Sequence, residues 1–181
     1  MTEVRKDISS DTPLAVIILA AGNGTRMGSE IPKVLHPVAG RAMIRQVLDT
    51  VETVSPERVV VVVGSQMEKV KTISQPHITV VQEEQLGTAH AVIQARGALD
   101  GFLGDVLVVF GDTPLITSDT MQFMKHSLGG NDENNLVVLG FHLENPTGYG
   151  RIRCSQDGGV EAIVEDLDAT AEELQITLCN S

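Results

Sequence analysis

A glycine-bearing loop followed by two basic side chains is the segment best suited to chemistry. Residues 19–27 read Leu-Ala-Ala-Gly-Asn-Gly-Thr-Arg-Met and follow an aliphatic run, and Arg26 and Lys33 supply the cations. A glycine-rich turn after a strand exposes backbone N–H groups that can hold phosphate oxygens. Met27 stands where a dinucleotide fingerprint needs Gly or Ala and where a P-loop needs Gly-Lys-Ser/Thr. The pattern favours a triphosphate ligand outside these two motif classes, and the alternative is a tight turn with solvated cations.

Asp112 is a second residue whose position suits a reaction on phosphates. It follows the aliphatic run 106–110, which predicts a carboxylate at the C-terminal end of a central strand. Mg²⁺ takes one or two protein carboxyl oxygens and completes its shell with phosphate and water. Asp112 is therefore a candidate magnesium ligand. The alternative is a plain turn, because Gly, Asp and Pro within 111–114 are turn formers.

Short aliphatic runs separated by helical patterns indicate the elements that position these residues. The runs are continuous, as in strands covered on both faces of a parallel sheet, and they occupy 15–20, 59–63, 78–81, 106–110 and 136–143. An apolar stripe predicts a helix over 43–51, Thr88 can cap a second helix, and Asp119 can open a third that runs to Leu128. The alternation predicts an α/β fold with a Rossmann-like open, mostly parallel sheet and right-handed crossovers.

The pattern changes after Leu143. The segments 151–154 and 160–164 flank Ser-Gln-Asp-Gly-Gly and predict an antiparallel hairpin insertion that turns at 157–159. A helical start is expected near 168–174 and a further strand at 176–179. Because the chain ends directly after that strand, we expect one domain over 14–181 that is truncated at its C-terminal end and preceded by a polar extension over 1–13.

Charge and composition disfavour several classes of function. The 181 residues carry a net charge of −11, whereas the first 66, with seven bases and seven acids, are neutral. The acidic remainder is either a solvated surface or a cation site. The charge and an aromatic content of 3% disfavour nucleic-acid binding. Cys154, Cys179 and the five histidines show no zinc-ligand spacing, and the sequence has no long apolar span or signal peptide. We therefore expect a reduced, cytoplasmic protein with no membrane partner.

Six sequence strings together resemble the N-acetylglucosamine-1-phosphate uridylyltransferases that form the N-terminal part of bacterial bifunctional GlmU proteins. The resemblance runs from about Leu14 to the last residue. Its strings lie at 19–27, 31–35, 84–90, 111–115, 146–151 and 179–181. The first string by itself indicates only the wider sugar-nucleotidyltransferase superfamily. Gln-Leu-Gly-Thr and Pro-Thr-Gly-Tyr-Gly-Arg are far more specific.

The resemblance implies a Mg²⁺-dependent reaction in which N-acetylglucosamine 1-phosphate attacks the α-phosphorus of UTP, giving UDP-N-acetylglucosamine and pyrophosphate. Positioning and charge neutralisation would carry the catalysis. Arg26 and Lys33 are the implied catalytic cations, and Asp112 is the implied metal ligand. Gln82 would pair with the uracil edge, although without the motif it reads as an ordinary surface residue. The implied nucleotide contacts are Leu19, Ala20, Ala21, Gly22, Lys33, Gln82, Gly87, Thr88, Phe110, Gly111 and Asp112.

The resemblance also implies a sugar site. Gly150 would bind the acetamido group through its backbone amide, and Glu165 and Asn180 would bind sugar hydroxyls, although Glu165 lies among other acids and reads equally as part of a solvated face. Leu167 departs from the family pattern, which has lysine there, and the change could weaken binding or turnover. The family's second magnesium ligand, an Asn, and its trimer-forming β-helix are expected beyond residue 181. Full-length relatives are therefore expected to be homotrimers, whereas this chain could be monomeric.

Three functions remain open at this point. The first is the uridylyltransferase reaction, and the second is nucleotide binding without turnover. The third is another nucleotidyltransferase, for instance one similar to the molybdenum-cofactor guanylyltransferases, which share the first loop. The Gln-Leu-Gly-Thr string speaks against the third function.

Overall fold

Seven consecutive apolar residues form the central strand of a parallel sheet. In the computed structural model, which describes residues 12–22, 24, 28–29, 31–129 and 136–180, β1 (Leu14–Ala20) is buried at every position. It pairs in parallel with β4 (Arg58–Gly64) on one side and with β6 (Asp105–Phe110) on the other. β5 (Ile78–Gln82) pairs with β4 and completes the order β5-β4-β1-β6. The predicted parallel α/β sheet is confirmed.

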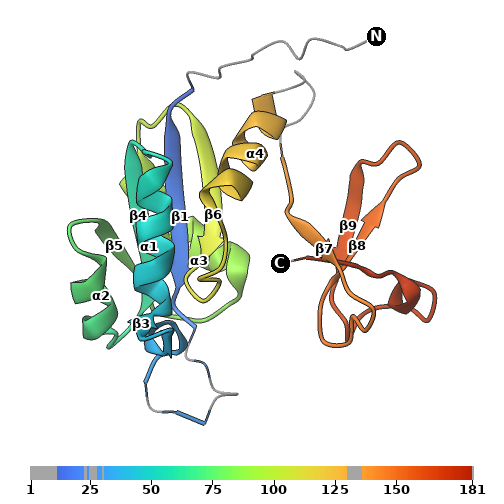
Figure 1. The fold of residues 1–181 in the computed structure, drawn as a ribbon, viewed down its shortest axis with the longest axis horizontal. Coiled ribbons are helices and arrows are strands. Elements are labelled where there is room, and N and C mark those ends of the chain that lie inside the picture. The colour runs from blue at the N-terminus through green and yellow to red at the C-terminus, as the bar shows by residue number, and fades with distance from the viewer. Residues whose placement is uncertain (1–11, 23, 25–27, 30, 130–135, 181) are drawn as a thin grey trace. The chain divides into compact units, whose positions relative to one another are not determined.

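Helices cover both faces of this sheet (Figure 1). Successive residues of β1 point to opposite faces, so Val16 and Ile18 belong to one apolar cluster and Ile17 and Leu19 to another. The first cluster includes buried residues of α1 (Met43–Thr53), α2 (Glu68–Ser74) and α4 (Ser118–Gly129). The second is covered by α3 (Thr88–Gln94). Continuous aliphatic strands are the consequence of burial on both sides.

Short elements join these layers. β2 (Pro37–Val38) and β3 (Arg41–Ala42) form a small antiparallel ribbon before α1. Single 3-10 turns cover Lys33–Leu35 and Arg96–Leu99. Every helix in the described ranges falls short of the length and apolar character that a membrane span requires.

The C-terminal part of the chain forms an antiparallel sheet. Its strands are β7 (Gly140–His142), β8 (Arg151–Cys154), β9 (Val160–Val164) and β10 (Leu178–Asn180), in the order β7-β10-β8-β9. The hairpin of β8 and β9 and the final strand agree with the sequence expectation. Residues 1–126 and 127–181 are two compact units.

Two strand expectations were wrong. The run 136–143 forms only the three-residue strand β7, which lies in the antiparallel sheet and is only partly buried. Its apolar residues therefore do not have the cover on both faces that a continuous run suggests. Asp112 follows an edge strand instead of a central one, since β6 pairs with β1 alone among the described strands. Local sequence does not encode strand order.

Two helical expectations also need correction, and one helix was missed. Thr88 is the first residue of α3, Gly87 is its N-cap, and no side chain caps it. The helical start at 168–174 is reduced to one 3-10 turn over Glu173–Gln175, which Thr170 and Glu173 stabilise by reciprocal hydrogen bonds of 2.9 and 3.3 Å. Helix α2 was missed because only two of its residues, Val70 and Ser74, are buried, too few to show a stripe.

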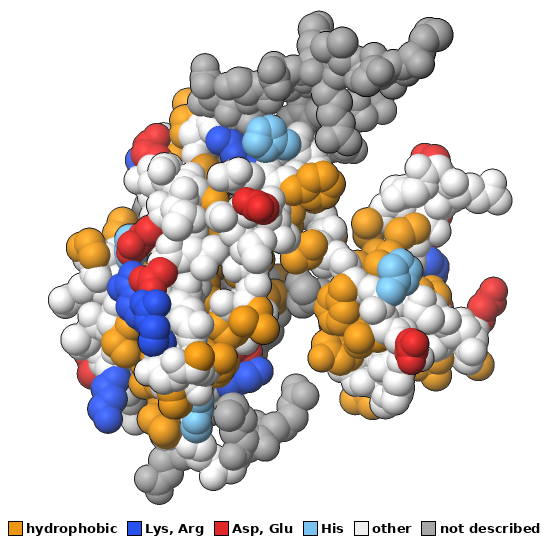
Figure 2. All heavy atoms as spheres, in the orientation of Figure 1, with side chains coloured by type: hydrophobic (Ala, Val, Ile, Leu, Met, Phe, Trp, Pro, Cys, Tyr) orange, Lys and Arg blue, Asp and Glu red, His pale blue; other side chains and the backbone are white. Residues whose placement is uncertain are grey.

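A network of charges covers one side of α1. Arg45 bonds to Asp49 at 2.7 Å and to Glu52 at 3.0 Å, Arg41 also pairs with Asp49, and His77 bonds to Glu52 at 3.1 Å. Figure 2 shows basic and acidic side chains next to each other over this helix. Burial works to raise the pKa of Asp49, but hydrogen bonds from Arg45 and Arg41 hold that pKa below its ordinary value. The hydrogen bond from His77 is the largest influence that lowers the pKa of Glu52.

Truncating the centre of the sheet should cost much of the stability. Ile18 is fully buried between β4 and β6, so Ile18→Ala should lower the free energy of unfolding by about 3 to 4 kcal/mol and Ile18→Val by about 1 kcal/mol. Urea denaturation followed by circular dichroism measures both. Ile78→Ala is the control, because Ile78 is 48% exposed and its truncation should cost less than about 1 kcal/mol. Equal losses at the two sites would contradict this account of the core.

The charge network should make the free energy of unfolding depend on pH. Because folding lowers the pKa of Glu52, its contribution is present above the unfolded-state pKa and is lost as the pH falls through the folded-state pKa. Glu52→Gln should therefore flatten the fall of the unfolding free energy between about pH 6 and pH 3. Urea denaturation over a pH series measures the slope, and the difference from wild type should shrink in about 1 M salt. An unchanged slope would show that Glu52 does not contribute.

Candidate functional site

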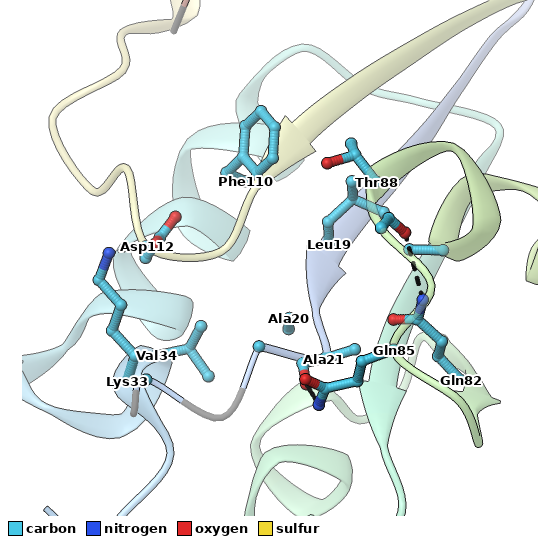
Figure 3. Close-up of a pocket in the computed structure, with 14 residues that line it drawn as sticks. Leu19, Ala20, Ala21, Lys33, Val34, Gln82, Gln85, Thr88, Phe110 and Asp112 are labelled. Carbon is cyan, nitrogen blue, oxygen red and sulfur yellow. Dashed lines mark hydrogen bonds and ion pairs between the residues drawn. The ribbon is translucent and has the colours of Figure 1, made fainter. Parts of the chain in front are cut away.

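A pocket of about 300 Å³ opens at the C-terminal ends of three strands of the parallel sheet. Leu19 and Ala20 end β1, Gln82 ends β5 and Phe110 ends β6, and all four residues line the pocket (Figure 3). Parallel strands align their carboxyl ends at one edge of a sheet, and ligands of open α/β folds bind there. The first compact unit therefore carries a pocket where this class of fold is expected to hold a ligand.

Two features bring Lys33 into the pocket. Gly24 has a φ of +62°, and a Cβ atom there would lie 2.9 Å from Cβ of Lys33, so only glycine lets the loop pass this close. Val34, which is buried in the core, anchors the 3-10 turn that begins at Lys33. The Lys33 side chain then extends along the pocket with its amine directed at Asp112 (Figure 3).

Lys33 and Asp112 form an ion pair. The distance from Nζ of Lys33 to Oδ2 of Asp112 is 2.6 Å, and the two side chains are 44% and 27% exposed. The pair places one cation and one carboxylate at the end of β6. No cluster of three or more His, Cys, Asp and Glu in the described ranges could hold a metal by itself. A single carboxylate such as that of Asp112 fits Mg²⁺, because this ion can take one protein carboxylate and complete its shell from phosphates and water.

Gln82 and Gln85 tie the other side of the pocket together. Gln82 is only 4% exposed, and its Nε2 donates to the Gly87 carbonyl at 3.3 Å and contacts Nδ1 of His90 at 3.1 Å. Gln85 donates from Nε2 to the Ala21 carbonyl at 2.8 Å. These bonds hold the segment between β5 and α3 against the end of β1 (Figure 3).

Most residues expected at the nucleotide site lie in this one pocket, although their roles remain predictions. The lining includes Leu19, Ala20, Ala21, Gly22, Lys33, Gln82, Gly87, Thr88, Phe110 and Asp112. Gly111 adjoins the lining and donates its N–H to the Leu19 carbonyl at 2.9 Å. Arg26 lies outside the described residues.

Three further residues line the pocket without having been assigned a contact, namely Val34, Gln85 and Ala91, and Gly24 of the predicted phosphate-binding loop lines it as well. Gly24, Val34 and Gln85 belong to the strings that carried the resemblance, so membership of those strings was the available signal. Ala91 lies just outside those strings. It is 5% exposed, packs in the second cluster and also lines the pocket.

The second unit holds the three residues expected at a sugar site. Gly150 and Asn180 are adjacent, because the Asn180 N–H donates to the Gly150 carbonyl at 3.2 Å and a Cβ on Gly150 would lie 2.7 Å from Oδ1 of Asn180. Glu165 directly follows β9 and is exposed. Leu167, which replaces the family lysine, is 96% exposed. The roles of these residues remain predictions.

Sequence comparisons match nearly the whole chain to nucleotidyltransferases. The model of the MobA-like NTP transferase domain matches residues 16–165. A bifunctional protein GlmU of Paramagnetospirillum magneticum is 51% identical over 95% of this chain, and that of Rhodospirillum rubrum is 52% identical over 94%. The chain spans 38% of the length of each of these two relatives.

Solved structures show the same fold at low sequence identity. The UTP-bound UGPase of Acinetobacter baumannii is 17% identical, with a TM-score of 0.68 over 93% of this chain and 72% of that one. HddC of Yersinia pseudotuberculosis, complexed with GMP-PN, is 21% identical, with a TM-score of 0.66 over 83% of this chain and 68% of that one. With the family match and the GlmU relatives, this chain belongs to the MobA-like NTP transferase domain family and is homologous to the N-terminal uridylyltransferase part of bifunctional GlmU proteins.

Proposed function

We propose that this chain transfers UMP from UTP to N-acetylglucosamine 1-phosphate and releases pyrophosphate. The observation that carries the proposal is the pocket at the strand ends, which joins a glycine loop, the Lys33–Asp112 pair and the buried amide of Gln82. A backbone loop and a lysine suit phosphates, a lone carboxylate suits a phosphate-bound Mg²⁺, and an amide suits a base edge. Identity of about 50% to GlmU proteins over almost the whole chain supports the substrates.

The reaction is a substitution at phosphorus. A phosphate oxygen of the sugar phosphate forms a bond to the α-phosphorus of UTP, and the bond from that phosphorus to the bridging oxygen of the β-phosphate breaks, so pyrophosphate leaves with the electron pair. Lys33 neutralises charge on the triphosphate while the loop amides around Gly22 hold its oxygens. Mg²⁺, held by Asp112 when bound, supplies further charge neutralisation. Two anions must approach each other, so positioning and neutralisation carry the catalysis.

The remaining assignments belong to the same proposal. Arg26 is the second catalytic cation, and Gly150, Glu165 and Asn180 bind the sugar. Gly150 and Asn180 are in contact. The backbone amide of Gly150 and the side chain of Asn180 therefore suit neighbouring groups on one sugar ring. A cytoplasmic location and the homotrimeric state of full-length relatives are expectations from the resemblance.

Pyrophosphate release tests the proposed function directly. The purified chain is incubated with N-acetylglucosamine 1-phosphate, Mg²⁺ and each of UTP, GTP and CTP in turn, and pyrophosphate is measured by a coupled assay. We expect release only when UTP, the sugar phosphate and Mg²⁺ are all present. UTP binding by calorimetry without release would indicate a non-catalytic nucleotide-binding protein. A preference for GTP would indicate a guanylyltransferase.

Asp112→Asn should abolish most of the metal-dependent turnover while sparing the fold. The variant keeps the shape of the side chain but removes the charge that holds Mg²⁺, and we expect kcat to fall by about 10²- to 10³-fold. Turnover is measured over a Mg²⁺ titration, and thermal unfolding checks the fold. Asp100→Asn is the matched control, because Asp100 is exposed and lies outside the pocket lining. Turnover retained by Asp112→Asn would disprove the metal assignment.

A further inference from the structure

The side chain of His90, on α3, lies between the amides of two glutamines. One is Gln82 at the end of β5 and the other is Gln94 on α3. Its Nδ1 lies 3.1 Å from Nε2 of Gln82, and its Nε2 lies 3.1 Å from Nε2 of Gln94. His90 has no assigned role in the proposed reaction, and it is absent from the pocket lining. Its ring reaches the pocket lining through the contact with Gln82.

The neighbouring carbonyls determine which group of each amide faces the ring. The Gly87 carbonyl, 3.3 Å from the Gln82 amide, can only accept, so the NH₂ group of Gln82 must lie on that side. The same NH₂ group faces Nδ1 of His90, which must therefore be the unprotonated, accepting nitrogen. A neutral imidazole then carries its proton on Nε2.

The second amide is the one that can adapt. A neutral imidazole has one acceptor nitrogen, so Gln82 and Gln94 cannot both donate to it. Gln82 is buried and is also fixed by Gly87, whereas Gln94 is only half-buried. Gln94 can turn its amide oxygen toward Nε2–H and give up its bond to the His90 backbone carbonyl. The orientation of the buried Gln82 amide therefore determines which ring nitrogen of His90 carries the proton.

The result is that Gln82 presents its oxygen to the pocket. Both contacts of the amide with described residues are made by Nε2, which leaves Oε1 available to accept from a ligand. Figure 3 shows this oxygen on the side of Ala21 and Gln85. An acceptor in this position selects a ligand that offers an N–H group.

We propose that His90 is a positioning residue that fixes the Gln82 amide with Oε1 toward the nucleobase, and so selects uracil over cytosine. This inference rests on the proposed function. Uracil carries an N–H between its two carbonyls, whereas cytosine has an unprotonated ring nitrogen at the same place. If the amide were free to turn, its NH₂ group would face the base and match cytosine. With cytosine bound, Oε1 of Gln82 and the unprotonated ring nitrogen would both be acceptors, and neither would have a partner. This cost is the source of the discrimination between the two bases.

Removing the ring nitrogens should relax base selection. His90→Phe keeps a ring of similar size but cannot accept from Gln82, leaving the 3.3 Å bond to Gly87 to hold the amide. We expect the ratio of kcat/KM for UTP to that for CTP to fall about tenfold, mainly through KM. His90→Asn can place an acceptor near the position of Nδ1 and should keep the ratio within about threefold of wild type. His77→Phe, a half-buried histidine bonded to Glu52, is the matched control and should leave the ratio unchanged.

A double variant separates positioning from a general effect on structure. In a Gln82→Ala background, His90→Phe should produce no further change in the UTP to CTP ratio, because the amide through which His90 acts is gone. An additional fall of similar size in that background would overturn the proposal. A ratio unchanged by His90→Phe alone would overturn it as well.

Two readouts distinguish failure of this inference from failure of the proposed function. Calorimetric binding of UTP and CTP to the wild-type chain tests base preference without turnover, and no preference for UTP there means that the proposed function fails. Long-range ¹H–¹⁵N NMR of neutral His90 tests the positioning contact whether or not any nucleotide binds. The Nε2–H tautomer is expected, and the Nδ1–H tautomer would overturn the role of His90.

Discussion

The pairing of β1 with β4 and β6 is the constraint on which the rest of the first unit depends. β1 is buried at every residue, so each of its backbone groups must find a partner in a neighbouring strand, and parallel pairing on both sides provides them. Because all the strands run in the same direction, their C-terminal ends meet at one edge. The loop after β1, the amide at the end of β5 and the carboxylate after β6 are brought together by that geometry alone.

Charge balance governs the polar side of the pocket. Among the described residues, Lys33 is the ion-pair partner of Asp112. The pair is partly exposed, so it contributes little to stability. In the proposed function, the pair places a cation and a carboxylate side by side, and a triphosphate and its metal ion would each use one of them.

The opposite side of the pocket is governed by hydrogen bonding in a buried environment. Gln82 is almost fully buried, so a donor or acceptor without a partner there is costly, and its neighbours determine which way the amide turns. The pocket of the first unit thus carries a cation and a carboxylate on one side and a fixed amide on the other. This division matches a nucleotide, which is charged at one end and carries a flat base at the other.

The sequence by itself determined the strands β1, β4, β5 and β6, the helix α1, the hairpin of β8 and β9, and the residue types that surround the pocket. Hydrophobic runs and turn residues act locally, so they can be read directly from the chain. Only the tertiary structure decided that β6 is an edge strand, that β7 joins the antiparallel sheet, that Lys33 pairs with Asp112 and that His90 contacts Gln82. These features depend on strand order and on contacts between residues distant in sequence, and local periodicity carries no information about which distant partner an element will meet.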